Sequence, residues 1–181
     1  MVFLRTQTPL FDGTPRAFLH IAPEPALRPH FAAAAGPGYR AADQRPDTGV
    51  EALDVTDIGY PSATFEVIYC SHVLEHVPED RRALGELRRV LKPGGFAILN
   101  VPITAAATIE DPSVTDPEER LRRYGQRDHV RRYGPDYTDR LAQAGFVVRR
   151  VLPGDLLDPA EVRQLGLAGS GAGALFYCTP R

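Results

Sequence analysis

Residues 65–101, FEVIYCSHVLEHVPEDRRALGELRRVLKPGGFAILNV, carry the clearest structural signal in the chain. The run from Phe65 to Cys70 is rich in β-branched and aromatic side chains, which favour a strand. From about Glu79 to Leu91 apolar residues recur at helical spacing, which predicts an amphipathic helix. Phe96 to Val101 is apolar on both faces except at Asn100, as expected for a strand inside a covered parallel sheet. The stretch therefore predicts a strand–helix–strand unit.

The same alternation of elements extends in both directions from this unit. Before it, the sequence predicts strands over Ala17–Ile21, Tyr39–Ala42 and Val50–Leu53, and a helix over Pro25–Ala35 that Pro29 interrupts or kinks. After it, we expect helices over Pro117–Tyr124 and Asp136–Ala144, the latter closed by Gly145, and strands over Phe146–Val151 and Ala174–Cys178. Strands that alternate with helices indicate an α/β fold with a mainly parallel sheet.

One interval does not fit a regular α/β unit. About seven residues separate the predicted strands 39–42 and 50–53, whereas a parallel crossover normally needs a dozen or more. Either the third strand is a short excursion, or the helix between the two strands is missing.

Length and composition limit the classes of protein. The 181 residues fit one domain, and a formal net charge of −2 gives no electrostatic reason to expect a nucleic-acid or anionic membrane partner. Cys70 and Cys178 lack metal-type spacing, so we expect buried free thiols in a reducing compartment and no zinc. The N-terminus lacks the features of a signal peptide and no segment is apolar enough to span a bilayer, which makes the cytoplasm the expected location.

Two blocks of the sequence resemble the class I S-adenosylmethionine-dependent methyltransferases. Residues 54–77 contain an acidic residue, a turn, a Phe-Glu-Val run and the element Leu-Glu-His-Val, in the order that this family uses. Residues 82–99, with ELRRVLKPGGFAIL, are similar to the family's next block. The resemblance extends over residues 17–179 and implies a Rossmann-like, mainly parallel sheet with helices on both faces and an antiparallel last strand. It also implies S-adenosyl-L-methionine as cofactor and S-adenosyl-L-homocysteine as product.

A narrower resemblance concerns the first motif. Residues 19–24, LHIAPE, look like a subgroup whose first motif reads Leu-His-x-Ala-Pro-Glu, and residues 125–131, GQRDHVR, look like the second half of that subgroup. Most class members have Gly-x-Gly-x-Gly after the first strand, where this chain has Ala22, Glu24 and Ala26. Glycine lets a backbone approach a ligand closely, so this loop must reach the cofactor in another way, or cofactor binding is altered.

The resemblance implies a set of cofactor-binding residues. Asp43 stands where the family binds the ribose hydroxyls, and Asp54 stands where it binds the adenine amine, with the backbone of Val55 reading the ring edge. The alternative for both aspartates is a turn-forming role, because Asx turns are common beside strands. Glu24 is expected to bind the ammonium of the cofactor or only to favour a helix N-terminus. The remaining expected contacts are His20, Ala22, Cys70 and Ser71.

Histidines are the expected catalytic side chains, because imidazole titrates near neutral pH. His72 follows the predicted strand 65–70 directly, and His76 comes four residues later; His129 belongs to the second subgroup motif. The alternative for His72 is a hydrogen-bonded rim residue, and that for His76 is a helix-cap or packing residue. The His72–His76 pair also suggests a metal site, but the sequence offers no third ligand, so no metal is expected.

Residues 103–134 are too long for a plain connection, and long loops are often lids or binding loops. We expect this insertion to cover an anionic or sugar-like substrate, with Tyr124, Gln126, Asp128 and Arg131 in contact with it. The alternative is a solvated helix whose arginines pair with Glu118 and Glu119.

The acceptor class remains broad. The chain begins about 16 residues before its first predicted strand, whereas related enzymes usually have helices there that roof the pocket. The site is therefore expected to be open, to be roofed by a partner or the second subunit of a homodimer, or to belong to a longer protein. The expected acceptor is an oxygen or nitrogen of a small molecule, glycan or peptide. The competing hypotheses are an inactive methyltransferase-like binding module and, less well matched for lack of Gly-x-Gly-x-x-Gly, a nucleotide-dependent oxidoreductase.

Overall fold

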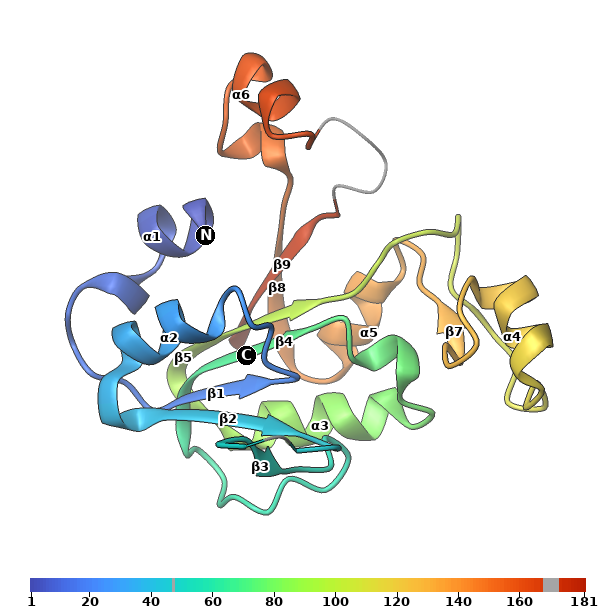
Figure 1. Cartoon of the computed structure of the whole chain (residues 1–181), viewed down its shortest axis with the longest axis horizontal. Helices are drawn as coiled ribbons and strands as arrows, with labels where there is room; N and C mark the ends of the chain where they lie inside the picture. The colour runs from blue at the N-terminus through green and yellow to red at the C-terminus, as the bar shows by residue number, and fades with distance from the viewer. Residues whose placement is uncertain (47, 168–172) are drawn as a thin grey trace.

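The structure, a computed structural model, describes residues 1–46, 48–167 and 173–181. Its centre is a seven-stranded sheet in the order β3-β2-β1-β4-β5-β9-β8 (Figure 1). The strands are β1 (Phe18–Ile21), β2 (Tyr39–Asp43), β3 (Glu51–Ala52), β4 (Phe65–Ser71), β5 (Leu91–Asn100), β8 (Phe146–Val151) and β9 (Leu175–Pro180). The first five pair in parallel, and β9 runs antiparallel to both of its neighbours. The predicted Rossmann-like sheet with an antiparallel last strand is confirmed.

Helices cover both faces of this sheet (Figure 1). The helical segments around the sheet are α1 (Val2–Gln7), η1 (Pro9–Phe11), α2 (Arg28–Ala35), η2 (Gly36–Gly38), η3 (Leu74–His76), α3 (Asp80–Val90) and α5 (Tyr137–Gln143). Alternate residues of β4 point to opposite faces. Val67 and Tyr69 therefore pack with α1 and α2, whereas Ile68 and Cys70 pack with α3 and α5.

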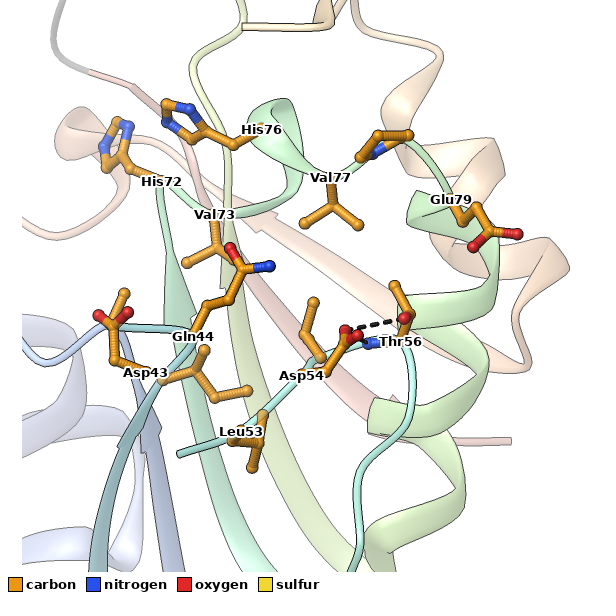
Figure 2. A pocket seen from close by; sticks show the side chains of 14 residues that line it. Asp43, Gln44, Leu53, Asp54, Thr56, His72, Val73, His76, Val77 and Glu79 are labelled. Atoms are coloured by element: carbon orange, nitrogen blue, oxygen red, sulfur yellow. Dashed lines mark hydrogen bonds between the residues drawn. The ribbon is translucent and has the colours of Figure 1, made fainter. Parts of the chain in front are cut away.

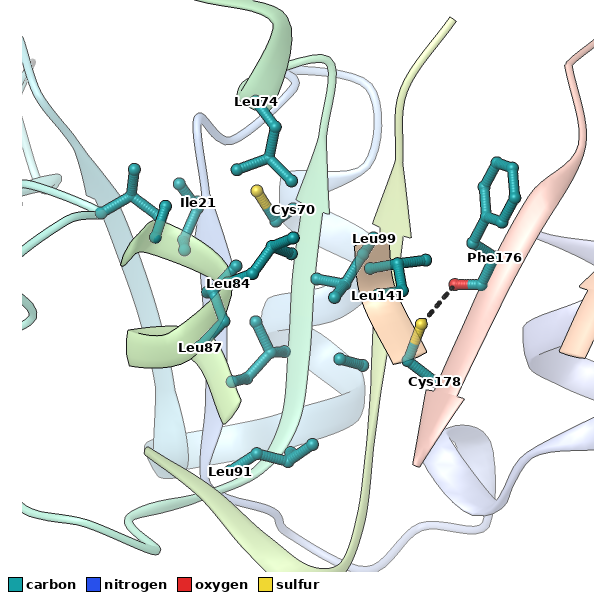
Figure 3. Packing of buried hydrophobic residues seen from close by; sticks show 14 of the residues in the cluster. Ile21, Cys70, Leu74, Leu84, Leu87, Leu91, Leu99, Leu141, Phe176 and Cys178 are labelled. Atoms are coloured by element: carbon teal, nitrogen blue, oxygen red, sulfur yellow. Dashed lines mark hydrogen bonds between the residues drawn. The ribbon is translucent and has the colours of Figure 1, made fainter. Parts of the chain in front are cut away.

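The larger core cluster lies between the sheet and α3 and α5 (Figure 3). Leu84 and Leu87 of α3 and Leu141 of α5 are fully buried there. Both cysteines are buried free thiols in the same cluster, as predicted. Burial raises the pKa of the Cys70 thiol well above its ordinary value, which makes it an inert core side chain and not a nucleophile.

Two predictions about the N-terminal half are resolved by the structure. Pro29 does not interrupt or kink a helix, because α2 begins only at Arg28 and its first turn tolerates proline. The third strand is a short excursion: β3 has two residues, both exposed, and pairs with β2, and the described residues between the two strands, 44–46 and 48–50, form no helix. The end of β2 and the loop after β3 therefore remain accessible at the same sheet edge.

Residues 103–134 extend beyond the carboxyl ends of β4 and β5 (Figure 1). They contain α4 (Pro117–Tyr124) and a small antiparallel pair, β6 (Ile109–Glu110) with β7 (Arg131–Arg132). α4 has the predicted bounds, with Asp116 as an N-terminal cap and Gly125 in the left-handed region after its last turn. The long polar segment is thus an ordered structure next to the ligand-binding edge that parallel sheets use.

The C-terminal part adds η4 (Pro153–Asp155) and α6 (Pro159–Gln164), which lie away from that edge (Figure 1). Among the residues that the structure describes, no helix has the length and apolar character needed to cross a membrane.

Candidate functional site

A cavity of about 370 Å³ opens at the carboxyl ends of β1, β2 and β4 (Figure 2). β1 lies between β2 and β4, so the strand order continues along the chain to β2 and β3 on one side of β1 and to β4 and β5 on the other. Open α/β sheets bind ligands at the carboxyl ends of the strands where the strand order reverses in this way. The cavity has an apolar wall of Leu53, Val55, Val73 and Val77, and polar groups from Asp43, Gln44, Asp54, Thr56 and His72. This combination of apolar surface and a few polar groups is typical of cofactor pockets.

Asp43 and Asp54 both line this cavity, and each forms an Asx turn with one carboxylate oxygen. Asp43 Oδ1 accepts a hydrogen bond of 2.8 Å from the backbone N–H of Arg45. Asp54 Oδ1 accepts hydrogen bonds of 2.8 Å from both the N–H and the hydroxyl of Thr56, which lower the pKa of Asp54. The second oxygen of each carboxylate has no partner among the described residues. The turn-forming role and the ligand-binding role are therefore compatible, because they use different oxygens.

The loop after β1 contains a residue in the left-handed backbone region, which glycine normally occupies. Ala22 has φ of +49°, and its N–H donates to the carbonyl of Ala42 at a distance of 2.9 Å. Alanine in the left-handed region costs about 1–2 kcal/mol. This loop therefore holds an alanine in a conformation that glycine adopts without strain, and Ala22 lines the cavity.

We expect Ala22→Gly to stabilise the protein by about 0.5–1 kcal/mol. Relief of the left-handed strain exceeds the roughly 0.4–1 kcal/mol that glycine adds to the entropy of the unfolded chain. Urea unfolding measures the difference. Ala33→Gly on the exposed face of α2 is the matched control and should destabilise by about 1 kcal/mol, because Ala33 is helical. If both variants destabilise equally, Ala22 is not strained.

His20 and Glu24 form a pair beneath this loop. His20 is fully buried; its Nε2 lies 2.7 Å from a carboxylate oxygen of Glu24 and its Nδ1 lies 2.8 Å from the hydroxyl of Tyr39. The imidazole also packs edge-on against the rings of Phe31 and Tyr69. His20 thus joins β1 to Tyr39 of β2 and to Glu24 of the loop after β1. Neither His20 nor Glu24 lines the cavity, although the sequence predicted both as cofactor contacts.

Of the other expected cofactor contacts, Ala22, Asp43, Asp54 and Val55 line the cavity, whereas Cys70 and Ser71 do not. Gln44, Thr56 and Glu79 line it as well, and the sequence reasoning missed them. The sequence could have indicated Gln44 as a lining residue, since it directly follows Asp43 at the end of β2. It could not have indicated Glu79, because the position of Glu79 depends on the turn before α3.

His72 lies on the boundary between this cavity and a second one. The second cavity, of about 690 Å³, is lined by His72, Glu75, His76, Tyr124, Gln126, His129, Arg131 and other residues of the insertion. His72 and His76 form part of both linings and lie across the first cavity from Leu53 and Asp54 (Figure 2). His72 has φ of +56°, a conformation that non-glycine residues seldom adopt outside functional sites or turns. Two adjoining chambers therefore meet at His72.

The predicted histidines come together at this boundary. His72 Nδ1 lies 3.3 Å from a carboxylate oxygen of the buried Glu75, and this hydrogen bond raises the pKa of His72. The rings of His76 and His129 meet edge to face with centroids 4.6 Å apart. Burial lowers the pKa of His129, and His76 adds to that effect.

The predicted substrate contacts have different surroundings. Tyr124 and Gln126 line the second cavity, whereas Asp128 is not among its lining residues and lies 3.2 Å from His76 Nδ1. Arg131 also lines it, but its guanidinium is buried and committed to the protein. It donates to the carbonyls of Leu74, Val77 and Pro78 and to Glu110. Arg131 thus holds the η3 turn in place, and its donors face the protein interior instead of a ligand.

Four charged residues and a tyrosine form a network beside the second cavity, buried except at Glu110, which we call the Asp80 network: Asp80, Glu110, Arg131, Tyr133 and Arg140. Asp80 accepts hydrogen bonds of 2.6 Å from both Tyr133 and Arg140. Arg140 and Arg131 also bind Glu110, and these contacts, those of Arg140 above all, lower the pKa of Glu110 to about 2. The network joins the insertion to α3 and α5.

The lowered pKa of Glu110 predicts acid sensitivity. Its folded-state pKa of about 2 lies below the ordinary value of 4.5, so its stabilisation is complete above pH 4.5 and is lost as the pH falls towards 2. Thermal melts of the wild type should therefore show a larger loss of melting temperature over this interval than those of Glu110→Gln, which keeps the other carboxylates with lowered pKa values, such as Asp54. Parallel pH curves for the two proteins would contradict the role of Glu110.

The exposed arginines of the insertion pair with its own acids. Arg122 and Arg123 both form ion pairs with Glu119, and Arg127 pairs with Glu118. The alternative that the sequence left open, a solvated helix with internal pairs, therefore describes α4.

Comparisons with known proteins find similarity to methyltransferases. A family model described as "Methyltransferase domain" matches residues 30–99, which is less than half of the chain. The probable methyltransferase ltbC of Aspergillus luteorubrus is 46% identical over 42 residues, which cover 22% of this chain and 15% of that protein. The matches span 15% to 29% of the length of the curated relatives.

Solved structures share the fold over the whole chain. An S-adenosylmethionine-dependent methyltransferase from Mesorhizobium loti has a TM-score of 0.62 at 15% identity, with 100% of this chain and 98% of that chain covered. A 1,6-didemethyltoxoflavin-N1-methyltransferase from Burkholderia thailandensis, solved with bound 1,6-didemethyltoxoflavin and S-adenosylhomocysteine, has a TM-score of 0.56 at 16% identity, with 93% of this chain and 72% of that chain covered. The chain has the Rossmann-like methyltransferase fold. Together with the family-model match over residues 30–99, that fold supports placement in class I.

Proposed function

We propose that this chain is an S-adenosylmethionine-dependent methyltransferase whose acceptor is an oxygen or nitrogen nucleophile of a small molecule, glycan or peptide. The observation that carries the proposal is the pair of adjoining cavities that meet at His72, one with two sheet-end aspartates and the other lined by the insertion. The family-model match and the shared fold support S-adenosylmethionine as the cofactor.

The residues of the first cavity fit this cofactor chemically. The free oxygen of Asp43 is suited to the ribose hydroxyls and that of Asp54 to the adenine amine, while Leu53 and Val55 offer apolar contact to the base. When bound, the cofactor supplies a methyl carbon that its sulfonium makes electrophilic. The task of the chain is then to align the acceptor and exclude water. His72 belongs to both linings, so we assign it to contact with the acceptor.

The insertion, residues 103–134, forms one wall of the acceptor chamber in this proposal. Tyr124, Gln126 and His129 line the chamber from that side, and Thr104 and Arg132 contribute to its rim. Arg132 donates to the side chain and carbonyl of Thr104, which orients its guanidinium at the edge of the chamber. A polar acceptor with hydroxyl or carboxylate groups suits this lining.

Calorimetric titration with S-adenosylmethionine and S-adenosylhomocysteine tests cofactor binding, and transfer of labelled methyl to a panel of hydroxyl and amine acceptors tests the reaction. We expect one cofactor site per chain, and we expect His72→Ala to lower kcat at least about tenfold with little change in S-adenosylhomocysteine affinity. Absence of heat and of a thermal shift with both nucleosides would refute the proposal. Binding without turnover on any acceptor would favour the inactive binding module, for which the glycine-free first motif is the supporting feature.

A further inference from the structure

We propose that Glu75, His76 and His129 form a binding site for one divalent transition-metal ion, of which Zn²⁺ is the best chemical match, at the floor of the second cavity. One ligand atom from each of these residues lies within 4.8 Å of the other two. All three residues line that cavity, so an ion held there would face its interior.

The carboxylate of Glu75 supplies an independent reason to expect a cation. The residue is 1% exposed, and its Oε2 has no hydrogen-bond partner among the described residues, while Oε1 contacts His72. A buried carboxylate oxygen without a donor is costly, and native structures seldom keep one without a bound ion or water. A neutral imidazole whose Nδ1 carries the ring proton has an acceptor at Nε2, so neither His76 nor His129 in that tautomer donates to this oxygen.

Those Nδ1 contacts have the pattern that metal-binding histidines show. His129 Nδ1 lies 3.3 Å from the carbonyl oxygen of Tyr124, and His76 Nδ1 lies 3.2 Å from a carboxylate oxygen of Asp128. A histidine that binds a metal usually donates its other ring N–H to a carbonyl or a carboxylate, which fixes the ring and its tautomer. Nε2 of each ring is then the nitrogen left for the ion.

The backbone holds the three ligands in place before any ion binds. The N–H of Val130 donates to the carbonyl of Glu75 at 2.9 Å, which joins the two ligand segments directly. Arg131 adds bonds to the carbonyl of Leu74 in the η3 turn and to that of Pro78 just after it. Ligands that are far apart in the sequence are thus fixed by bonds that do not involve their side chains, which limits the entropy that metal binding would cost.

The donor set decides the class of ion. Two imidazoles and one carboxylate suit Zn²⁺ and related transition ions, whereas Ca²⁺ and Mg²⁺ prefer an oxygen-only shell. Three protein ligands leave a coordination position open towards the cavity, as in catalytic zinc sites. If the proposed function holds, an acceptor hydroxyl in that position loses its proton to solvent more readily, a new C–O bond forms and the C–S bond of the sulfonium breaks.

The test is calorimetric titration of chelator-treated protein with ZnCl₂, repeated with CoCl₂ while the visible absorption of Co²⁺ is recorded. We expect one ion per chain and a Zn²⁺-dependent rise in melting temperature. Glu75→Gln and His129→Ala should each weaken binding about 100-fold or more and abolish the Co²⁺ absorption, and Asp128→Asn should weaken it about 10-fold. His30→Ala, an exposed histidine outside the site, is the matched control and should bind like the wild type.

Two results would overturn the site: no ion bound by the wild type, or wild-type affinity for the ion in both Glu75→Gln and His129→Ala. Circular dichroism and S-adenosylhomocysteine affinity, measured with chelator present, check that each variant is folded. These readouts also separate the two proposals. Metal binding without nucleoside binding would refute only the proposed function, and nucleoside binding without metal binding would refute only the metal site.

Discussion

Replacement of Asp43 by alanine should lower the affinity for S-adenosylhomocysteine by more than 100-fold. In the proposed complex the free oxygen of Asp43 accepts charge-assisted hydrogen bonds from ribose hydroxyls, and two such bonds contribute roughly 3 kcal/mol or more. The carboxylate is partly buried at the end of β2, so solvent screens the interaction only in part. Isothermal titration calorimetry of the two proteins gives the affinities directly.

Two further variants separate charge from local structure. Asp43→Asn keeps an oxygen that accepts from the N–H of Arg45 and should lose affinity to a smaller extent. Asp57→Ala removes an exposed acid close to the same sheet edge and should bind like the wild type. Equal affinities for Asp43→Ala and Asp57→Ala would exclude Asp43 from the nucleoside site.

The strand–helix–strand unit at residues 65–101 was predictable because its signals are local. The apolar residues of β4 and α3 have the periods of a strand and a helix, and α3 spans Asp80–Val90 against the predicted 79–91. The position of Asp43 and Asp54 at one sheet edge follows from strand order, so they could be predicted to converge. The length of β3 could not, because two residues of pairing leave no periodic pattern.

The site beyond this edge depends on contacts between distant residues, which one sequence does not reveal. Glu75 is buried because the insertion covers it, and its backbone bond to Val130 spans the whole of β5 and α4. The sequence paired His76 with His72 and offered no third metal ligand. The structure instead groups His76 with Glu75 and His129, because packing of the insertion brings these residues together.

His20 illustrates a different limit. Its position at the strand end, beside the unusual loop, predicts a cofactor contact, but the side chain points to the face that α2 covers. Which face a strand residue occupies depends on register, and in a strand buried on both faces the apolar pattern does not define it. The pair with Glu24 is visible only when the loop path is known.

The largest loss of stability is expected for Asp80→Ala, at about 3–5 kcal/mol. Asp80 is 3% exposed and accepts from Tyr133 and Arg140, so its removal leaves a buried hydroxyl and part of a buried guanidinium without their partner. Glu110 still binds Arg140, which keeps the loss within that range. Urea unfolding measures the free energy of unfolding of each variant.

The same substitution should also loosen the insertion, because the Asp80 network joins it to α3 and α5. Hydrogen exchange in residues 103–134 should become faster than in the wild type, and the exchange rates of the sheet strands should increase less. Asp139→Ala, an exposed acid in the first turn of α5, is the matched control and should change stability by about 0.5 kcal/mol or less. If Asp80→Ala were as mild as this control, the ion pairs of the network would contribute no more than surface charges do.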